Sequence, residues 1–333
     1  MIVKKTIIIP LAFLIFMLGY AFYKNDACYY FYFCKEKNYL NKAEYGYELP
    51  AAYSSLFAKR TYDSIVKDRE LLILSLSSAY LKDNIDHTEH YIKENYSHIN
   101  FNKNTILKQA QKLSKETYYG FELSKEEKDS YMQAGITTID NKGHSACIIF
   151  TPSRIMQKIY DTSSPGPVID PDETAYIHEV MHCVFLASVN RYEEFNRSFK
   201  GLELYTFKEI ELIDDKEEFK IRKMHKEHVL ESYADVATLM HIYFDIHPDN
   251  TSFRSAASNL TSLRKLDKGN INEYTIGHYT YPYISRIHED YRNLDEYKID
   301  YKNDPVKTVM SYLEKYGENF IFKYEDFKKV ISN

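Results

Sequence analysis

The sequence predicts a mainly α protein of the α+β class, with an N-terminal transmembrane anchor, a helical subdomain and a C-terminal domain that carries a small sheet. Three observations predict this: a charge-free run near the N-terminus, helical spacing of apolar residues, and a short apolar strand followed by long apolar helices. The chain of 333 residues is long enough for one large or two modest domains. The expected segments are 1–23 as anchor or signal peptide, 24–42 as an aromatic juxtamembrane stretch, 43–140 as helical subdomain and 141–333 as C-terminal domain.

The N-terminus has the features of a membrane signal. Lys4 and Lys5 precede Thr6–Phe22, 17 residues without a charge, which nearly span a hydrocarbon core at about 1.5 Å per residue. A cleaved signal peptide is the alternative, with Gly19–Ala21 as a small-x-small cleavage site. The aromatic run Tyr29–Phe33 is typical of an interfacial belt and favours the uncleaved anchor. We therefore expect a single-pass protein of the bacterial cytoplasmic (inner) membrane whose main domain is extracytoplasmic, or a secreted protein after cleavage.

Charge and cysteine content narrow the function classes. The 43 basic and 48 acidic residues give a net charge of −5, and without a basic excess we expect no nucleic-acid partner. In an oxidising compartment Cys28 and Cys34 could close a small disulfide loop. Cys147 and Cys183 are expected to be buried small hydrophobic residues, with a bridge between them left open.

Residues 43–140 are expected to be helical. Apolar residues recur there at helical spacing, and the positions between them are rich in Lys and Glu. The predicted helices lie at Leu71–Leu81, around Tyr91–Tyr96 and at Asn104–Phe121. The charged residues of this segment are expected to face solvent.

The pattern changes in the middle of the chain. The apolar run SACIIF at Ser145–Phe150 predicts a short strand. A helix is predicted from Pro171 to about Val189, with Asp170 as N-cap and Glu173 placed for a capping-box-like closure. Further helices are expected at Glu217–Phe244, Val306–Lys315 and Lys323–Ile331.

The motif HEVMH stands inside an apolar helical stretch, Ala175–Leu186. His178 and His182 are four residues apart, so both imidazoles leave one helix face and can bind one ion. Glu179 points about 100° away around the helix. It therefore need not be a ligand and can act on water as a general base. The alternative is a pair of core histidines, each with its own hydrogen-bond partner.

The H-E-x-x-H motif resembles that of the gluzincin metallopeptidases, and this resemblance implies a third metal ligand from an E-x-x-x-D pattern on a later helix. The pattern occurs at Glu211/Asp215, Glu231/Asp235 and Glu296/Asp300. The first and last pairs lie in polar surroundings, whereas the second lies in the apolar stretch VLESYADVATLM. We therefore expect Glu231 to be the third ligand and Asp235 to orient a ligand histidine. The alternative is an interior salt bridge from Glu231 to Lys226 or Arg222.

HEVMH and LESYAD together resemble the gluzincin zinc metallopeptidases, the thermolysin-like clan, over residues 170–240. The resemblance implies a zincin-like catalytic domain and a zinc metalloendopeptidase, which hydrolyses peptide bonds of a peptide or protein substrate by zinc-activated water. The residues that it assigns are His178, His182 and Glu231 as Zn²⁺ ligands, Glu179 as general base and Asp235 as the partner of His178.

The resemblance also implies groups that bind the substrate. Ser145–Phe150 would be the edge strand against which an extended substrate pairs. A tetrahedral oxyanion needs a donor besides the metal, and the segment GHYTYPY offers His278, Tyr279 and Tyr281, of which His278 and Tyr281 are the predicted catalytic residues. The alternative is that these tyrosines are structural, as expected in a chain with 32 tyrosines. His241 and His247 remain open as further candidates.

Two other functions are weighed against a peptidase. One is a non-catalytic, membrane-anchored binding or interaction protein with a gluzincin-like fold. Glu179 argues against it, because a site that only binds metal has no need of that carboxylate. The other is an exported helical protein in which HEVMH arises by coincidence and no metal binds.

Overall fold

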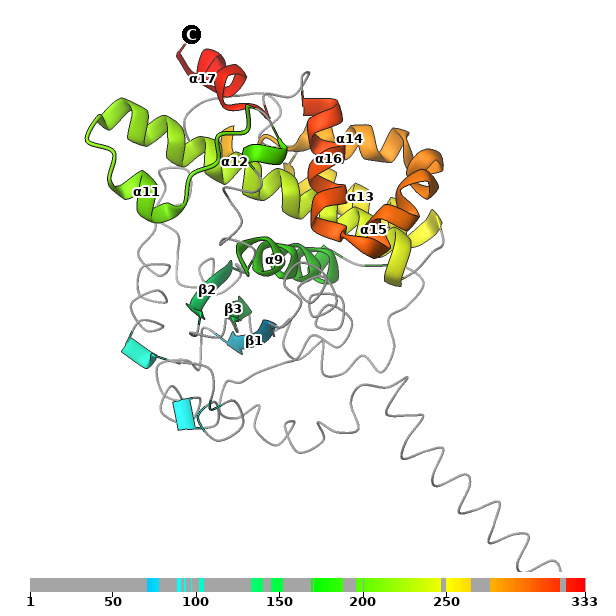
Figure 1. Ribbon diagram of the computed structural model, residues 1–333. Coiled ribbons are helices and arrows are strands. Elements are labelled where there is room, and N and C mark those ends of the chain that lie inside the picture. The colour runs from blue at the N-terminus through cyan, green and yellow to red at the C-terminus, as the bar shows by residue number, and fades with distance from the viewer. Residues whose placement is uncertain are drawn as a thin grey trace, which may run out of the picture.

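The computed structural model describes residues 71–77, 133–139, 145–151, 169, 171–187, 196–199, 201–246, 250–264, 276–317 and 322–332, with a few single positions between 89 and 104. These residues are mostly helical, as predicted (Figure 1). None of the helices among them is both long and apolar enough to cross a bilayer. The predicted anchor, the aromatic stretch, Cys28 and Cys34 lie outside the described residues, as do nearly all of the helices predicted around 91–96 and 104–121.

A three-stranded sheet forms one layer of the described fold, beside helix α9 (Figure 1). Its strands are β1 (Leu71–Ser77), β2 (Gln133–Ile139) and β3 (Ser145–Thr151) in the order β1-β3-β2, with β1 parallel and β2 antiparallel to β3. The helix predicted at Leu71–Leu81 is therefore wrong over Leu71–Ser77. A short apolar run fits a buried strand as well as a buried helix, and pairing with β3 decides for the strand.

The strand predicted from SACIIF is confirmed as β3, but its predicted place at the sheet edge is wrong. Cys147 pairs with Ile73 of β1 on one side and with Ile136 of β2 on the other. An inner strand uses its backbone donors and acceptors on both sides, so β3 has no row of groups left for a substrate. The described sheet also joins strands from both sides of the domain boundary predicted at residues 140 and 141.

Helix α9 (Pro171–Ala187) lies between the sheet and helix α12 (Lys216–His241) (Figure 1). It begins at Pro171 as predicted, while the predicted cap Asp170 lies outside the described residues. A disulfide joins Cys147 of β3 to Cys183 of α9, and both cysteines are fully buried. The expected burial of both cysteines is confirmed, and the bridge that the sequence left open does form, because α9 packs against β3 and brings the two side chains together.

Helix α12 (Lys216–His241) is the long central helix of the fold and follows the short helix α11 (Phe207–Glu211). Asp215 caps its N-terminus by accepting the backbone N–H groups of Glu217 and Glu218. Eighteen of its residues are buried, because α9 packs along one side and α16 along another. A π-helical turn, η3 (Ile242–Ile246), continues it.

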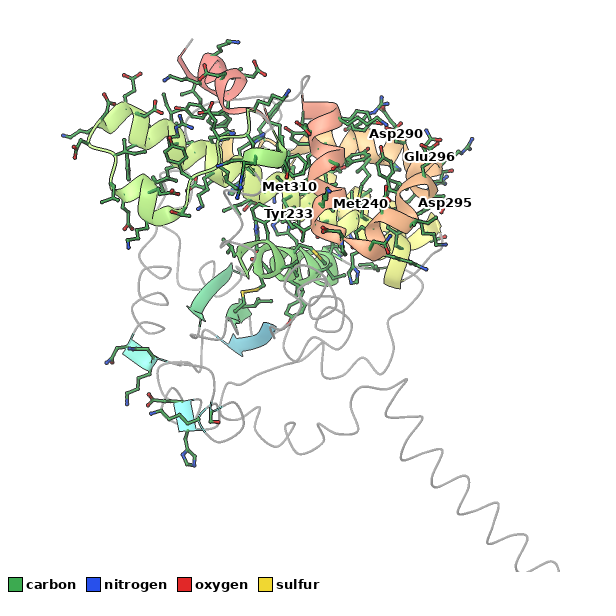
Figure 2. The ribbon with its side chains drawn as sticks, in the orientation of Figure 1. Tyr233, Met240, Asp290, Asp295, Glu296 and Met310 are labelled. Atoms are coloured by element: carbon green, nitrogen blue, oxygen red, sulfur yellow. A yellow bond between two sulfur atoms is a disulfide. The ribbon has the colours of Figure 1, made fainter. Side chains whose placement is uncertain are left out.

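The remaining helices complete the helical part of the fold around α12 (Figure 1). They are α13 (Asn250–Arg264), η5 (Ile276–His278), α14 (Tyr281–Glu289), η6 (Tyr291–Tyr297), α15 (Lys298–Asn303), α16 (Pro305–Gly317) and α17 (Tyr324–Ser332). Helix α13 packs against α9 and α14, and α15 packs against α16. Helices α16 and α17 confirm the two predicted C-terminal helices. Figure 2 shows Tyr233, Met240 and Met310 inside the helical layer, where they are fully buried, and Asp290, Asp295 and Glu296 at its outer edge.

Candidate metal centre

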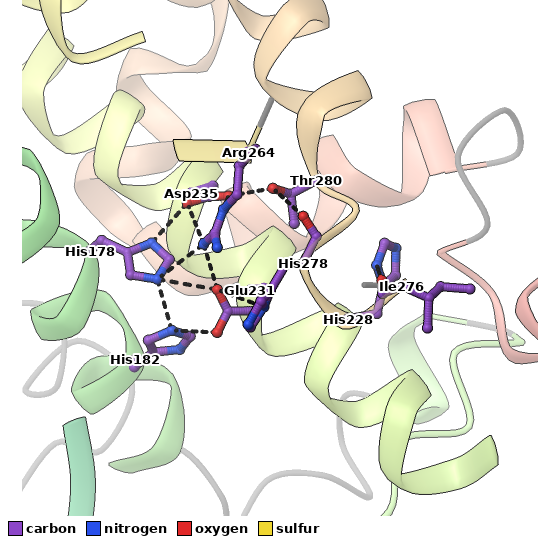
Figure 3. Close-up of polar contacts among 9 residues, drawn as sticks. All are labelled: His178, His182, His228, Glu231, Asp235, Arg264, Ile276, His278 and Thr280. Atoms are coloured by element: carbon purple, nitrogen blue, oxygen red, sulfur yellow. Dashed lines mark hydrogen bonds and ion pairs between the residues drawn. The ribbon is translucent and has the colours of Figure 1, made fainter. Parts of the chain in front are cut away.

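Three donor atoms meet where α9 faces α12 (Figure 3). The Nε2 atoms of His178 and His182 lie 3.0 Å apart. Glu231 Oε2 lies 3.4 Å from the first of these nitrogens, and Glu231 Oε1 lies 3.2 Å from the second. Among the described residues, this is the group of His, Cys, Asp and Glu side chains that has the spacing of a metal site. The structure thus brings together the three ligands predicted from the sequence.

The two helices position these donors by simple geometry. His178 and His182 are one turn apart on α9 and leave the same face. Phe185 packs against Tyr233 of α12 with ring centroids 4.5 Å apart, which holds the two helices together one turn from the donors. Both histidines are buried, whereas Glu231 is partly exposed.

The spacing of the donors fits a zinc ion. Zinc binds nitrogen and oxygen at about 2.0–2.1 Å in tetrahedral geometry, so its ligands lie roughly 3.3 Å from one another. The two nitrogens lie 3.0 Å apart, and each has a different oxygen of the Glu231 carboxylate near it, at 3.4 Å for His178 and 3.2 Å for His182. Two imidazoles and one carboxylate are also a ligand set that leaves the fourth position of zinc for water or substrate.

Asp235 lies directly behind His178, as predicted. Its Oδ1 is 2.8 Å from His178 Nδ1 and the carboxylate is fully buried. This contact turns the other ring nitrogen, Nε2, toward His182 and Glu231 (Figure 3). Burial lowers the pKa of His178, but the carboxylates of Asp235 and Glu231 outweigh it and raise the pKa to about 10.

Arg264, at the end of α13, completes the centre and was missed in the sequence. Its Nη2 lies 2.5 Å from Glu231 Oε2 and 3.4 Å from His178 Nε2. Its Nε and Nη2 lie 2.9 and 3.2 Å from the two oxygens of Asp235. Burial opposes ionisation of both carboxyl groups, but Arg264 and the neighbouring histidines outweigh it, so both pKa values are lowered.

A signal for Arg264 exists in the sequence. The buried positions of α13 include Phe253, Ala257 and Leu260, which follow helical spacing. The next position in that series is 264, so a charged residue stands on the apolar face of the helix. Such a residue needs a buried partner of opposite charge, and the Glu231/Asp235 pair supplies two.

The turn between η5 and α14 contributes the last groups. His278 Nδ1 lies 3.7 Å from Glu231 Oε2, so the structure brings this predicted residue to the centre. Thr280, also missed in the sequence, donates its hydroxyl to Asp235 Oδ2 at 2.5 Å. Tyr281 follows as the first residue of α14, and its catalytic role stays a prediction. Of the other histidine candidates, His241 is buried in the last turn of α12 and His247 lies outside the described residues.

Glu231 forms an interior salt bridge, but with Arg264 and not with the partners predicted as the alternative. Arg222 pairs with Glu203 and Glu218, and Lys226 donates to the backbone oxygen of Tyr205 at 2.9 Å. The interior salt bridge to Lys226 or Arg222 is therefore wrong, because Arg264 takes that place.

The other two E-x-x-x-D pairs lie on the surface. Glu211 is exposed and its companion Asp215 caps α12. Glu296 and Asp300 are exposed, and Figure 2 shows Glu296 at the outer edge of the helical layer. Their polar surroundings in the sequence predicted this correctly.

No protein-family model matches the chain, and no curated protein or solved structure matches it either. Any family assignment therefore depends on the residues and geometry of the centre itself.

Proposed function

We propose that the chain is a gluzincin-type zinc metallopeptidase. One observation carries the proposal: one ligand atom from each of His178, His182 and Glu231 lies within 4.8 Å of the others, a grouping that could hold a single metal ion. The sequence order supports it, since a general-base candidate, Glu179, directly follows the first ligand. The substrate class is a peptide or protein.

The residues around the centre suit hydrolysis of a peptide bond. A zinc ion held there would polarise the scissile carbonyl and make water more acidic. Glu179 is partly exposed on α9, so water can reach its carboxylate, which takes a proton from the attacking water and returns it to the leaving amine. His278 is near enough to Glu231 to serve as a donor to the developing oxyanion.

The proposal includes a location outside the cytoplasm. Disulfides persist in oxidising compartments and are rare in the cytosol. The Cys147–Cys183 bridge inside the core supports export of this part of the chain, in agreement with the signal anchor expected at residues 1–23. We propose a single-pass anchor in the bacterial cytoplasmic membrane, or secretion if the anchor is cleaved.

The first experiment measures zinc content and peptide cleavage on the purified full-length chain. Wild type is compared with Glu231→Ala, with Glu179→Gln and with a control, Glu227→Ala, which removes an exposed carboxylate one turn earlier on α12. About one zinc per chain is expected in all but Glu231→Ala. Cleavage is expected only in wild type and the control.

Two results would contradict the proposal. A folded wild-type chain that takes up no zinc when zinc is supplied has no such centre. Equal cleavage by wild type and Glu179→Gln excludes Glu179 as the general base.

A second candidate function is a non-catalytic binding protein that keeps the same site. The observation that favours it is Arg264, which already neutralises charge on Glu231 and Asp235 without a metal. Peptide cleavage separates the two functions, whether or not zinc is bound. If the chain is only a binding protein, neither wild type nor Glu179→Gln cleaves any peptide of a diverse library.

A further inference from the structure

Thr280 occupies a helix-capping position but does not use its side chain as a cap. It is the N-cap residue of α14, where a threonine hydroxyl commonly accepts a backbone N–H from the first turn. Here the Thr280 hydroxyl accepts no backbone N–H from the first turn of α14 (Tyr281–Glu289). It donates instead to Asp235 Oδ2 on helix α12, at 2.5 Å, and Thr280 is fully buried (Figure 3).

The first turn of α14 explains why the hydroxyl is available. Pro282 stands at the second helical position and has no N–H to satisfy. The N–H groups of Tyr283 and Ile284 bond to the backbone oxygen of Thr280, at 2.9 and 3.2 Å. The helix start is thus satisfied by backbone and by proline, and the side chain of Thr280 serves a different element.

Asp235 receives donors from three separate helical segments. His178 Nδ1 of α9 faces Oδ1, Arg264 of α13 reaches both oxygens, and the Thr280 hydroxyl bonds to Oδ2. A buried carboxylate with both oxygens occupied in this way has little freedom to rotate. Because Oδ1 faces the ring of His178, the orientation of the carboxylate sets the direction of His178 Nε2.

The Thr280 bond also holds the turn that carries His278. Gly277 lies so near α12 that a Cβ at this position would be 3.3 Å from Glu227 Cβ. His228 Nδ1 of α12 lies 3.1 Å from the backbone oxygen of Ile276. With Thr280 on Asp235, the turn is held to α12 at both ends, which places His278 3.7 Å from Glu231.

We propose that Thr280 is a positioning residue of the metal centre, whose hydroxyl fixes Asp235 and through it the imidazole of His178. This inference depends on the proposed zinc site. It goes beyond that site because it assigns a role to Thr280, which is not one of the three proposed ligands and bonds to Asp235.

The test compares zinc affinity of the full-length chain by competition with a chromogenic chelator. Thr280→Val keeps the shape and removes the hydroxyl, and Thr280→Ser keeps the hydroxyl. We expect Thr280→Val to bind zinc about 10- to 100-fold more weakly than wild type, the range typical of groups that orient a metal ligand. Thr280→Ser is expected to stay within about threefold of wild type.

Thr308→Val is the matched control. It removes a buried threonine hydroxyl that bonds to the backbone oxygen of Asp304 at 2.8 Å in α16. A merely structural role for Thr280 predicts that both valine variants lower the melting temperature and leave the zinc affinity of the folded protein unchanged. That result overturns the inference, as does equally weak binding by Thr280→Ser and Thr280→Val.

The test also covers a valine variant that does not fold and a wild type that binds no zinc. If Thr280→Val does not fold, Thr280→Ala replaces it, since alanine removes the hydroxyl without placing a methyl group against Asp235. If wild type binds no zinc, the proposed function fails and this inference fails with it. If wild type binds zinc and the alanine variant binds it equally well, only this inference fails.

Discussion

Helix α12 carries two clusters of buried polar side chains that are built in opposite ways. In its first half, His225 Nε2 lies 2.9 Å from the backbone oxygen of Phe322. Lys226 donates to the backbone oxygen of Tyr205 in the same region. Each of these groups reaches a partner of its own: His225 attaches the C-terminal segment to α12, and Lys226 attaches the segment that precedes α11.

In its second half, α12 supplies Glu231 to a point where donors converge on one another. The two Nε2 atoms of His178 and His182 face each other and the carboxylate at 3.0–3.4 Å. The difference teaches that a buried histidine by itself is no sign of a metal site. The sign is several lone-pair donors directed at one point, with other groups bonded to their far sides.

The largest effect on zinc affinity is expected when one histidine of each cluster is replaced by alanine in separate variants. His182→Ala removes a ligand and should weaken zinc binding about 1000-fold, since zinc binding of roughly 10–16 kcal/mol is shared among few ligands. His225→Ala should leave zinc affinity within about twofold and lower the free energy of unfolding by about 2 kcal/mol, because the carbonyl of Phe322 loses its partner. Chelator competition and urea denaturation measure the two quantities, and equal zinc loss in both variants would break the comparison.

The second-largest effect is expected from removing the Cys147–Cys183 disulfide, which attaches to β3 the helix that carries His178 and His182. Cys147 and Cys183 are 36 residues apart in the sequence, so replacing both by alanine should lower the free energy of unfolding by about 4 kcal/mol through added chain entropy of the unfolded state. Denaturation of the wild type with and without dithiothreitol checks this. A loss below about 1 kcal/mol would show that the packing of α9 on β3 suffices without the bond.

Low pH should reduce the free energy of unfolding of the metal-free protein through His225, in the first half of α12. Burial is the main reason why the pKa of His225 falls to about 3, and the nearby positive charge of Arg222 adds to it. The unfolded chain binds a proton below about pH 6.5 while the folded chain stays neutral, so this contribution is complete above pH 6.5 and is lost as the pH falls toward 3. We expect about 2 kcal/mol of lost stability by pH 5.

Urea denaturation at pH 7 and pH 5 tests this with His225→Gln, which can still donate to Phe322 but does not titrate. The variant should lose less stability than wild type over this interval. Below pH 4.5 a further loss is expected from Glu218, because hydrogen bonds from Tyr324, Arg222 and Lys328 outweigh its partial burial and lower its pKa to about 2. Equal pH dependence of wild type and His225→Gln would assign the acid sensitivity to other groups.

The smallest effect is expected at the two exposed E-x-x-x-D pairs. Glu211→Gln and Glu296→Gln should leave zinc affinity unchanged and alter stability by less than about 0.5 kcal/mol, because both side chains face solvent. Isothermal titration with zinc and thermal melting measure this. A marked loss of zinc in Glu211→Gln would move the third ligand away from Glu231.

The sequence was sufficient to predict the parts of the centre that follow from local periodicity. His178 and His182 share a face by helical spacing, and Glu231 stood out because its helix is apolar. The orienting role of Asp235 followed from its place one turn later. Each of these predictions used only the residue spacing and composition within a single helix.

The parts that were missed depend on contacts between distant segments. Thr280 reaches Asp235 across 45 residues, and no local pattern separates it from an ordinary helix cap. Leu71–Ser77 is a strand because it pairs with β3, which its own apolar run does not reveal. Arg264 is the exception, since its position on the buried face of α13 was visible in the spacing.

The two clusters share one uninterrupted helix of 26 residues, about 39 Å long. Its hydrogen-bond ladder has no proline or glycine from Lys216 to His241, so no hinge separates the half of α12 that contacts α17 from Glu231. We expect the backbone amides of the two halves to exchange as one cooperative unit. The docking of α17 would then affect how long the three candidate ligands stay together, although α17 supplies no atom to them.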